Sequence, residues 1–222
     1  MNLSQLRTQT RSLTGIQSTD ILSNAELDIY INEAYSEICR AHDWPFLINK
    51  DTINITSGTD TYALPASITG PNIASVVILS NDNNRRQLNM RSRVSMDRTS
   101  GPLPISKPVE YFWEGAYIGF WPVPNASETV TIRYYSMPSI LSDGNPTPII
   151  PDEYTNAIAY GAARRILMKE ADDTQRGKGY EDYFLQLIED MRKDILTERD
   201  RGIFRLGGRR KTYPSRTRYY GA

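Results

Sequence analysis

Residues 38–56 read ICRAHDWPFLINKDTINIT, and the spacing of their apolar side chains changes partway along. Up to the start of this stretch the spacing is helical, because one helix face collects Leu27, Ile31, Ala34 and Ile38. Trp44 precedes Pro45, and a residue before proline avoids helical geometry, so the helix must stop there. From Lys50 onward the period is two, as Thr52-Ile53-Asn54-Ile55-Thr56 alternates. The stretch therefore predicts a helix followed directly by a β-strand.

Upstream of this change, the sequence predicts two helices. The first runs from Leu3 and ends at Gly15, with apolar or small residues at steps of three and four. The second begins at Ser23, which has Glu26 three residues later in the pattern of a capping box.

Downstream, several short segments read as strands. Alternating residues and turn-forming residues predict strands over 52–56, 73–79, 109–113, 117–121 and 129–135, with a hairpin at Glu114-Gly115-Ala116. Prolines bound these segments, and proline cannot donate to a central ladder. The pattern favours a small sandwich or barrel.

Helical spacing returns after Pro146 and Pro148. One helix is predicted to begin near Pro151, and its small residues from Ala157 to Ala163 allow close packing. A final helix carries Tyr180, Phe184, Leu187, Met191 and Ile195 on one face, while Gly177 and Gly179 weaken its beginning.

The order helices, strands, helices predicts an α+β fold. Neither terminal pair of helices buries its apolar stripe alone, so we expect one helical bundle formed by the N- and C-terminal helices, with a small antiparallel β-domain inserted. The predicted divisions are 1–48 and 141–200 for the bundle, 49–140 for the β-domain and 201–222 for an extended C-terminal arm.

The formal charge of zero hides a strong asymmetry. The 222 residues hold 26 basic and 26 acidic side chains, but the last 22 hold seven basic and no acidic ones. The arm is therefore basic, and the rest of the chain has a net charge of −7. A frayed terminus, a nucleic-acid-binding arm and a protein-docking arm are all compatible with this composition. Its charged and aromatic residues are Arg201, Phe204, Arg205, Arg209, Arg210, Lys211, Tyr213, Arg216, Arg218, Tyr219 and Tyr220.

The sequence offers little catalytic chemistry. A single cysteine, Cys39, excludes an intrachain disulfide, and with a single histidine, His42, no metal site of several Cys or His ligands can form. A nucleophile–base pair of Cys39 and His42 is possible by spacing, but a core thiol and a helix-end imidazole are favoured. Likewise, Asp51, Asp60 and Asp172-Asp173 read as solvated loop charges. We predict no enzyme, no metal and no cofactor, and a soluble protein, since no signal core or membrane-spanning run occurs.

The motifs, taken in order, resemble a known family. They are His42-Asp43-Trp44-Pro45-Phe46-Leu47, Gly58-Thr59-Asp60-Thr61-Tyr62-Ala63-Leu64-Pro65, Lys107-Pro108-Val109-Glu110-Tyr111, Trp121-Pro122-Val123-Pro124-Asn125, Val130-Thr131-Ile132-Arg133-Tyr134-Tyr135, Leu141-Ser142-Asp143 and Ile150-Pro151-Asp152-Glu153-Tyr154. Across residues 3–200 the chain resembles the head-to-tail adaptor, or connector, proteins of tailed bacteriophages, especially short-tailed ones.

The resemblance implies a structural virion protein of the neck, made in the host cytoplasm. Such adaptors form a ring, commonly of twelve copies, beneath the dodecameric portal protein, extend the DNA channel and give tail or nozzle proteins a platform. Genomic duplex DNA is expected to pass through without specific binding. Because adaptor C-termini often dock into the portal, we expect the basic arm to do so. Contacts to neighbouring subunits or the tail are expected from Trp44, Trp113, Trp121 and Tyr154.

Three readings of individual features stay open. The tryptophans are core or subunit-contact anchors in preference to a carbohydrate platform. The basic arm also permits a nucleic-acid-binding module, and the β-domain permits a receptor-binding or tail-fibre accessory, which would form a trimer.

Overall fold

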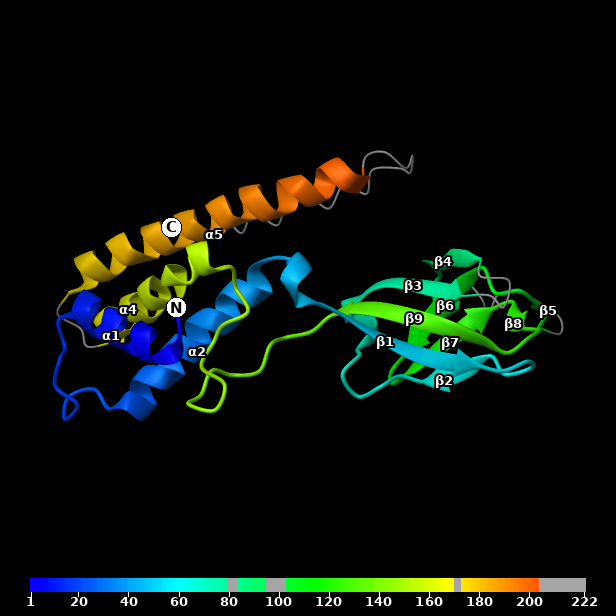
Figure 1. The fold of residues 1–222 in the computed structure, drawn as a ribbon, viewed down its shortest axis with the longest axis horizontal. Helices are drawn as coiled ribbons and strands as arrows, with labels where there is room; N and C mark the ends of the chain where they lie inside the picture. Colours follow the sequence, from blue (N-terminus) through cyan, green and yellow to red (C-terminus); the bar gives the residue numbers. More distant parts are fainter. Residues whose placement is uncertain (80–83, 95–102, 170–172, 204–222) are drawn as a thin grey trace.

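The computed structural model describes residues 1–79, 84–94, 103–169 and 173–203. It has two lobes joined end to end, one of helices and one of strands (Figure 1). Helices from both ends of the chain form the helical lobe, and the described strands come from the sequence between them. The predicted α+β class is confirmed.

The first helix, α1, spans Leu3–Thr14. Its start is capped reciprocally: the Gln5 backbone N–H donates to the Asn2 side chain, and the Asn2 N–H donates to the Gln5 side chain, both at 2.9 Å. Gly15 ends the helix in the left-handed region at φ 78°, where glycine carries no Cβ penalty. The predicted helix with its glycine stop is confirmed.

The second helix, α2, spans Asn24–Ala41. Ser23 Oγ accepts from the Glu26 N–H at 3.2 Å, as the capping pattern predicts. The Glu26 carboxylate does something else: it accepts from Lys169 Nζ at 2.9 Å and so ties α2 to a distant helix. The helix ends before Trp44-Pro45, and a short 3₁₀ turn, η1 (Pro45–Leu47), leads into the first strand.

The central helix of the lobe is α4, Asn156–Lys169, which follows a 3₁₀ turn, η3 (Asp152–Tyr154). It packs against α1, α2 and the last helix. Gly161 makes this possible, because a Cβ there would lie 2.7 Å from Phe184 Cε2 and 2.9 Å from Ala34 Cβ. The small residues predicted to allow close packing therefore do so within the subunit.

The last helix, α5, spans Thr174–Ile203 and begins earlier than Tyr180. Gly177 lies inside it, where a Cβ would come within 3.2 Å of Met168 Cγ on α4. The helix extends beyond the other helices toward the β-lobe (Figure 1). It also continues past residue 201, where the arm was predicted to start, so Arg201 is helical. Residues 204–222, with the rest of the predicted arm, lie outside the described residues.

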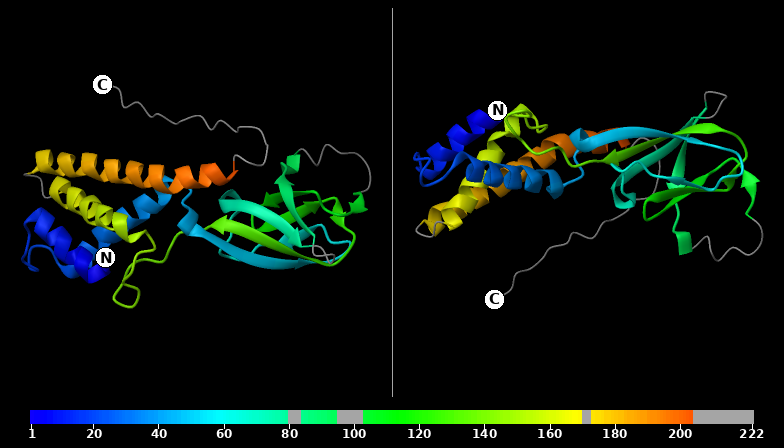
Figure 2. Two further views of the ribbon diagram at one scale, coloured as in Figure 1. Left: turned by 45° about the horizontal axis from the view of Figure 1, so that its top comes forward. Right: turned by 90° about the horizontal axis from the view of Figure 1, so that it is seen from below.

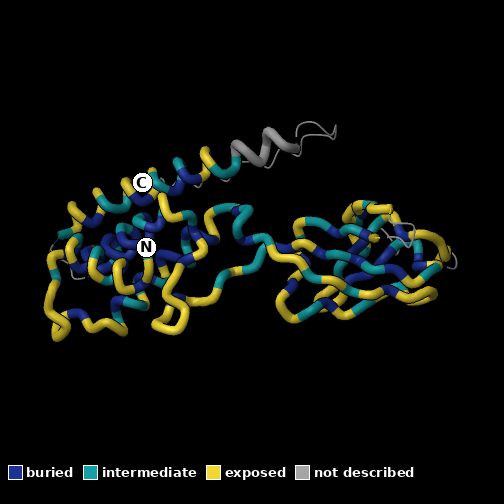
Figure 3. The backbone as a smooth tube through the Cα atoms, viewed as in Figure 1, coloured by how far each residue is buried: buried dark blue, intermediate teal, exposed yellow. Residues whose placement is uncertain are grey.

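Two separate hydrophobic cores hold the two lobes. In the helical lobe, Trp44 is fully buried, its Nε1 donates to the Ile38 carbonyl at 2.7 Å, and its ring stacks on Phe46. Figure 3 shows buried residues gathered inside each lobe, with partly exposed chain between them. Around Trp44 the core includes Leu3, Leu6, Leu27, Ile31, Ala34, Ile38, Ile158, Ala162, Phe184 and Met191.

The β-lobe contains a seven-stranded sheet in the order β1-β9-β3-β4-β6-β7-β2, and a small second pair, β5-β8. The strands are β1 (Ile48–Ile55), β2 (Thr61–Ala63), β3 (Ile73–Leu79), β4 (Arg85–Met90), β5 (Ile105–Ser106), β6 (Glu110–Glu114), β7 (Tyr117–Trp121), β8 (Val123–Pro124) and β9 (Glu128–Tyr135). Figure 2 shows the lobe from two further sides.

The predicted sheet is corrected in two places. The sheet is mostly antiparallel, but β4 pairs with β6, and β5 with β8, in parallel. The connection over residues 91–109 is long enough to return the chain in the same direction, which a hairpin is not. The short strands β2, β5 and β8 were not predicted. Strand β4 was also missed, because Leu88 is its only buried residue and its other side chains are mostly polar.

Two chain segments join the lobes, η1 into β1 and the residues after β9. They are tied together where the Ser136 N–H donates to the Leu47 carbonyl at 3.0 Å. The Asn49 side chain also donates to Ser136 Oγ at 2.5 Å. None of the described helices combines the length and apolarity that crossing a bilayer requires.

Candidate interaction surface of the helical lobe

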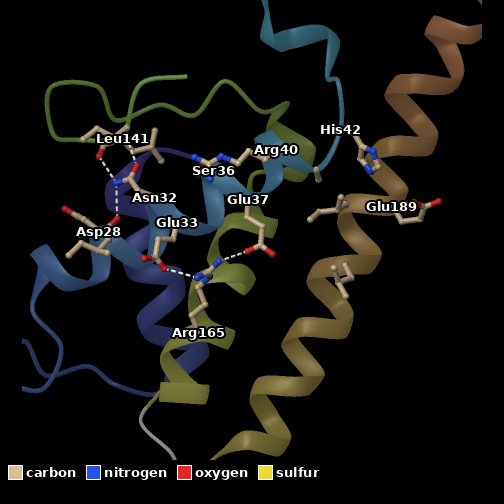
Figure 4. Close-up of a pocket in the computed structure, with 15 residues that line it drawn as sticks. Asp28, Asn32, Glu33, Ser36, Glu37, Arg40, His42, Leu141, Arg165 and Glu189 are labelled. Carbon is tan, nitrogen blue, oxygen red and sulfur yellow. Dashed lines mark hydrogen bonds and ion pairs between the residues drawn. The ribbon is translucent and has the colours of Figure 1, made fainter. Parts of the chain in front are cut away.

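A groove of about 1150 Å³ lies on the helical lobe. The outer face of α2 forms one wall, α5 forms the other, and the segment at Ile140-Leu141 closes one end (Figure 4). We call this the α2–α5 groove. Its residues are Asp28, Ile29, Asn32, Glu33, Ser36, Glu37, Arg40, Ala41, His42, Ile140, Leu141, Arg165, Leu185, Ile188 and Glu189.

Exposed apolar side chains mark this groove. The exposed fractions are 58% for Ile29, 72% for Ile140 and 52% for Leu185. Large aliphatic side chains exposed together around one hollow are typical of a protein-binding surface. The groove is therefore better suited to a protein partner than to a small polar substrate.

Asn32 holds the segment that carries Ile140. Its amide nitrogen donates to the Leu141 carbonyl at 3.0 Å and to the Asp28 carbonyl at 2.9 Å. The Leu141 N–H in turn donates to Asn32 Oδ1 at 2.6 Å (Figure 4). Because the backbone N–H and carbonyl of Leu141 both bond to one side chain of α2, Ile140 is held in a fixed position at the end of the groove.

A chain of ion pairs forms the floor. Arg165 donates to Glu33 at 2.9 Å and to Glu37 at 2.8 Å (Figure 4). Arg164, which is almost fully buried, donates to the same Glu37 and to Glu181 of α5 at 3.1 Å, and its guanidinium lies 4.3 Å from the centre of the Phe184 ring. Helices α2, α4 and α5 are thus fixed by shared charged groups as well as by packing.

These contacts set the ionisation of Glu37. Burial raises the pKa of its carboxyl, but the hydrogen bonds from Arg164 and Arg165 lower it more, so the pKa lies below the ordinary value of 4.5. Glu37 is therefore a stable anion near neutral pH, and the floor of the groove is rigid and charged.

The positions of Cys39 and His42 do not favour a nucleophile–base pair. Cys39 is buried, and burial raises the pKa of its thiol to about 12, so no thiolate is available near neutral pH. His42 caps the end of α2 with its ring edge-on to Trp44, and burial together with Arg192 lowers its pKa. Within the described residues, no three His, Cys, Asp or Glu side chains are placed to hold a metal ion.

The four predicted contact residues fall into different environments. Trp44 is a core residue, one of the two alternatives that the sequence left open, and its buried ring offers no surface to a partner. The hydroxyl of Tyr154 donates to Asp194 and so fastens η3 to α5. Trp113 packs flat on Gly70, where a Cβ would lie 2.0 Å from the ring, and is half-buried, as is Trp121.

The predicted arm residues from Phe204 to Tyr220 lie outside the described residues, and only Arg201 falls within a described helix. The α2–α5 groove was not predicted. The available signal was that Ile29 and Leu185 lie off the apolar stripes of their helices, but a single exposed aliphatic residue on a helix is common. The two become a surface only when the fold brings α2 and α5 together.

Comparison with protein families shows which one the chain matches. The model of a family described as "SU10 adaptor protein" matches residues 1–211, which includes both lobes and the first part of the predicted arm. No curated protein matches the chain.

Proposed function

The chain belongs to the SU10 adaptor protein family, and we propose that this phage head-to-tail adaptor forms a ring of twelve copies beneath the dodecameric portal of a short-tailed phage. Phage adaptors are structural components of the virion neck. In the proposed position the ring extends the DNA channel and provides the platform to which tail or nozzle proteins attach. The family match over both lobes carries this proposal.

The shape of the subunit supports different contacts for its two lobes. Two lobes with separate cores lie end to end, so one lobe can pack in a ring while the other reaches along the neck. We assign the ring contacts to the helical lobe, which holds the α2–α5 groove. The β-lobe, with half-buried Trp113 and Trp121, is assigned to tail or nozzle contacts.

The basic arm is proposed to dock into the portal. Seven basic residues and no acidic ones suit a carboxylate-lined groove, because each guanidinium presents a planar fork of donors. An arm that orders only on docking would make assembly sequential, with the portal first, the adaptor second and the tail third.

The charge of the helical lobe supports free passage of DNA. Residues 1–48 and 141–200 hold 11 basic and 19 acidic side chains, so a channel lined by this lobe would repel phosphates. A basic lining would instead bind duplex DNA by releasing counterions and would slow its movement.

The ring is tested by native mass measurement on the full-length protein, alone and mixed with the portal of the same phage. We expect a species of twelve adaptor copies on the portal. A trimer that does not bind the portal would overturn the proposal and favour the tail-fibre accessory.

The arm is tested by deleting residues 204–222, which leaves α5 complete. Co-sedimentation with the portal is expected to be lost, and a variant with Arg209, Arg210 and Lys211 changed to alanine should bind the portal more weakly at unchanged length. If the deletion leaves portal binding intact but removes salt-sensitive binding of duplex DNA, the arm belongs to a nucleic-acid-binding module instead.

A further inference from the structure

A second surface of the helical lobe is built from tyrosines. Tyr160 of α4 lies edge-on to Tyr180 and Tyr183 of α5, with ring centres 5.5 Å and 4.7 Å apart. Arg176 lies over Tyr180, and Gly179 completes a hollow of about 410 Å³. We call these five residues the tyrosine cluster. Tyrosine and arginine are the residue types that most often supply binding energy at protein interfaces.

The tyrosine cluster and the α2–α5 groove lie on opposite flanks of α5. Tyr183 and Leu185 are two residues apart, which separates them by about 200° around a helix. Phe184, between them, is fully buried in the lobe and fixes the orientation of both flanks. The helical lobe therefore presents two different surfaces on its two sides.

Gly179 has no role within the subunit that explains it. An interior helical glycine destabilises a helix by about 1 kcal/mol relative to alanine. A Cβ would overlap a neighbouring helix at Gly161 and make a tight 3.2 Å contact at Gly177, but at Gly179 it would meet nothing within 4 Å. An exposed backbone left open between tyrosines permits atoms of another molecule to approach closely.

The two surfaces complement each other. The cluster contributes aromatic rings and the hydroxyls of Tyr160 and Tyr183, whereas the Tyr180 hydroxyl and Arg176 already donate to the Leu13 carbonyl of their own subunit. The groove contributes exposed Ile29, Ile140 and Leu185, together with four carboxylates that each hold an arginine of their own subunit: Asp28, Glu33, Glu37 and Glu189. Apolar rings can fill the hollow between the aliphatic residues, while the hydroxyls of Tyr160 and Tyr183 donate to carboxylate oxygens at its edge, which accept more than one hydrogen bond.

We propose that the tyrosine cluster of one copy docks into the α2–α5 groove of the next copy. The inference rests on the proposed ring and identifies the interface between neighbouring copies. A contact between two different surfaces on opposite sides of a subunit is head-to-tail, and head-to-tail contacts close into rings when the rotation between copies allows it.

The test uses one variant for each surface. Leu185→Glu places a carboxylate in the groove, and Gly179→Glu fills the hollow while replacing glycine by a better helix former, so neither change should unfold the subunit. Each variant alone is expected to associate with itself at least about tenfold more weakly than the wild type, measured by native mass with and without portal. Thr8→Glu, an exposed change on α1, serves as the control and should assemble normally.

Mixing the two variants distinguishes this interface from other arrangements of the copies. The Leu185→Glu copy keeps its tyrosine cluster and the Gly179→Glu copy keeps its groove, so the mixture should form two-copy species that neither variant forms alone. If the mixture stays monomeric, or if either variant forms rings like the wild type, the proposed interface is wrong. A wild-type protein that never self-associates, even on the portal, would instead overturn the ring itself.

Discussion

Glu37 shows how single residues hold the helical lobe together. Its carboxylate accepts hydrogen bonds from Arg164 and Arg165. Only 7% of Arg164 is exposed to solvent, so water cannot easily replace these bonds. Removing one partner of a buried cation leaves a charge that water cannot easily solvate, which is more destabilising than losing an exposed ion pair.

Glu37→Gln is expected to lower the free energy of unfolding by about 1 kcal/mol at pH 7. Since the folded-state pKa of Glu37 lies below 4.5, its contribution is present above that pH and is lost as the pH falls through the folded value. The difference between wild type and variant should therefore shrink in acid. Urea unfolding at a series of pH values measures this.

Glu33→Gln is the matched control. Glu33 accepts a hydrogen bond from Arg165 alone and is about half exposed, so the change should cost less than about 0.5 kcal/mol. A Glu37→Gln effect no larger than this, or one that grows on acidification, would contradict the assigned role.

At the scale of elements, α4 is the helix on which the lobe depends. Gly161 lets it approach both α2 and α5, whereas Gly179 on α5 faces open space. The same substitution should therefore have opposite effects at the two positions.

Gly161→Ala is expected to destabilise the subunit by about 1–3 kcal/mol, because the new methyl group would overlap Phe184 and Ala34. Gly179→Ala should stabilise it by up to about 1 kcal/mol through helix propensity. Thermal unfolding of the two variants and the wild type gives the comparison. Equal effects at both positions would mean that the helices do not pack as described.

The elements also show what sequence patterns can and cannot predict. Helices α1 and α2 were predictable because capping residues and a glycine stop are local signals, and β3 because all its residues except Ser75 are apolar. Strand β4 was missed because its side chains are mostly polar and show no apolar alternation, although one of its partners, β3, directly precedes it in sequence. The start of α5 could not be fixed from sequence, because Gly177 is a weak helix former and the packing of α4 against it is not visible there.

The same limit applies to the interaction surface. A tryptophan such as Trp44 has the same local pattern whether it fills a core or contacts a partner, and only its full burial decides between them. The α2–α5 groove combines residues from 28 to 189 and exists only in the folded lobe. The basic arm, by contrast, is visible in the sequence, because seven basic residues without an acid need no tertiary structure to be recognised.

At the scale of the whole molecule, the two lobes have separate cores and narrow connections. The β-lobe is continuous in sequence, from β1 to β9, whereas the helical lobe is assembled from both ends of the chain. The β-lobe thus links the two parts of the helical lobe covalently, but its hydrophobic core is separate from theirs.

We expect the two lobes to unfold in separate steps. Gly161→Ala should lower the midpoint of one calorimetric transition and leave the other unchanged, since Gly161 contacts only the helical core. A segment of residues 47–137, which holds β1 to β9, should fold alone and show the unaffected transition. A single transition that shifts as a whole in the variant would show instead that the lobes are coupled, and the proposed ring and tail contacts would then respond to each other through the subunit rather than act independently.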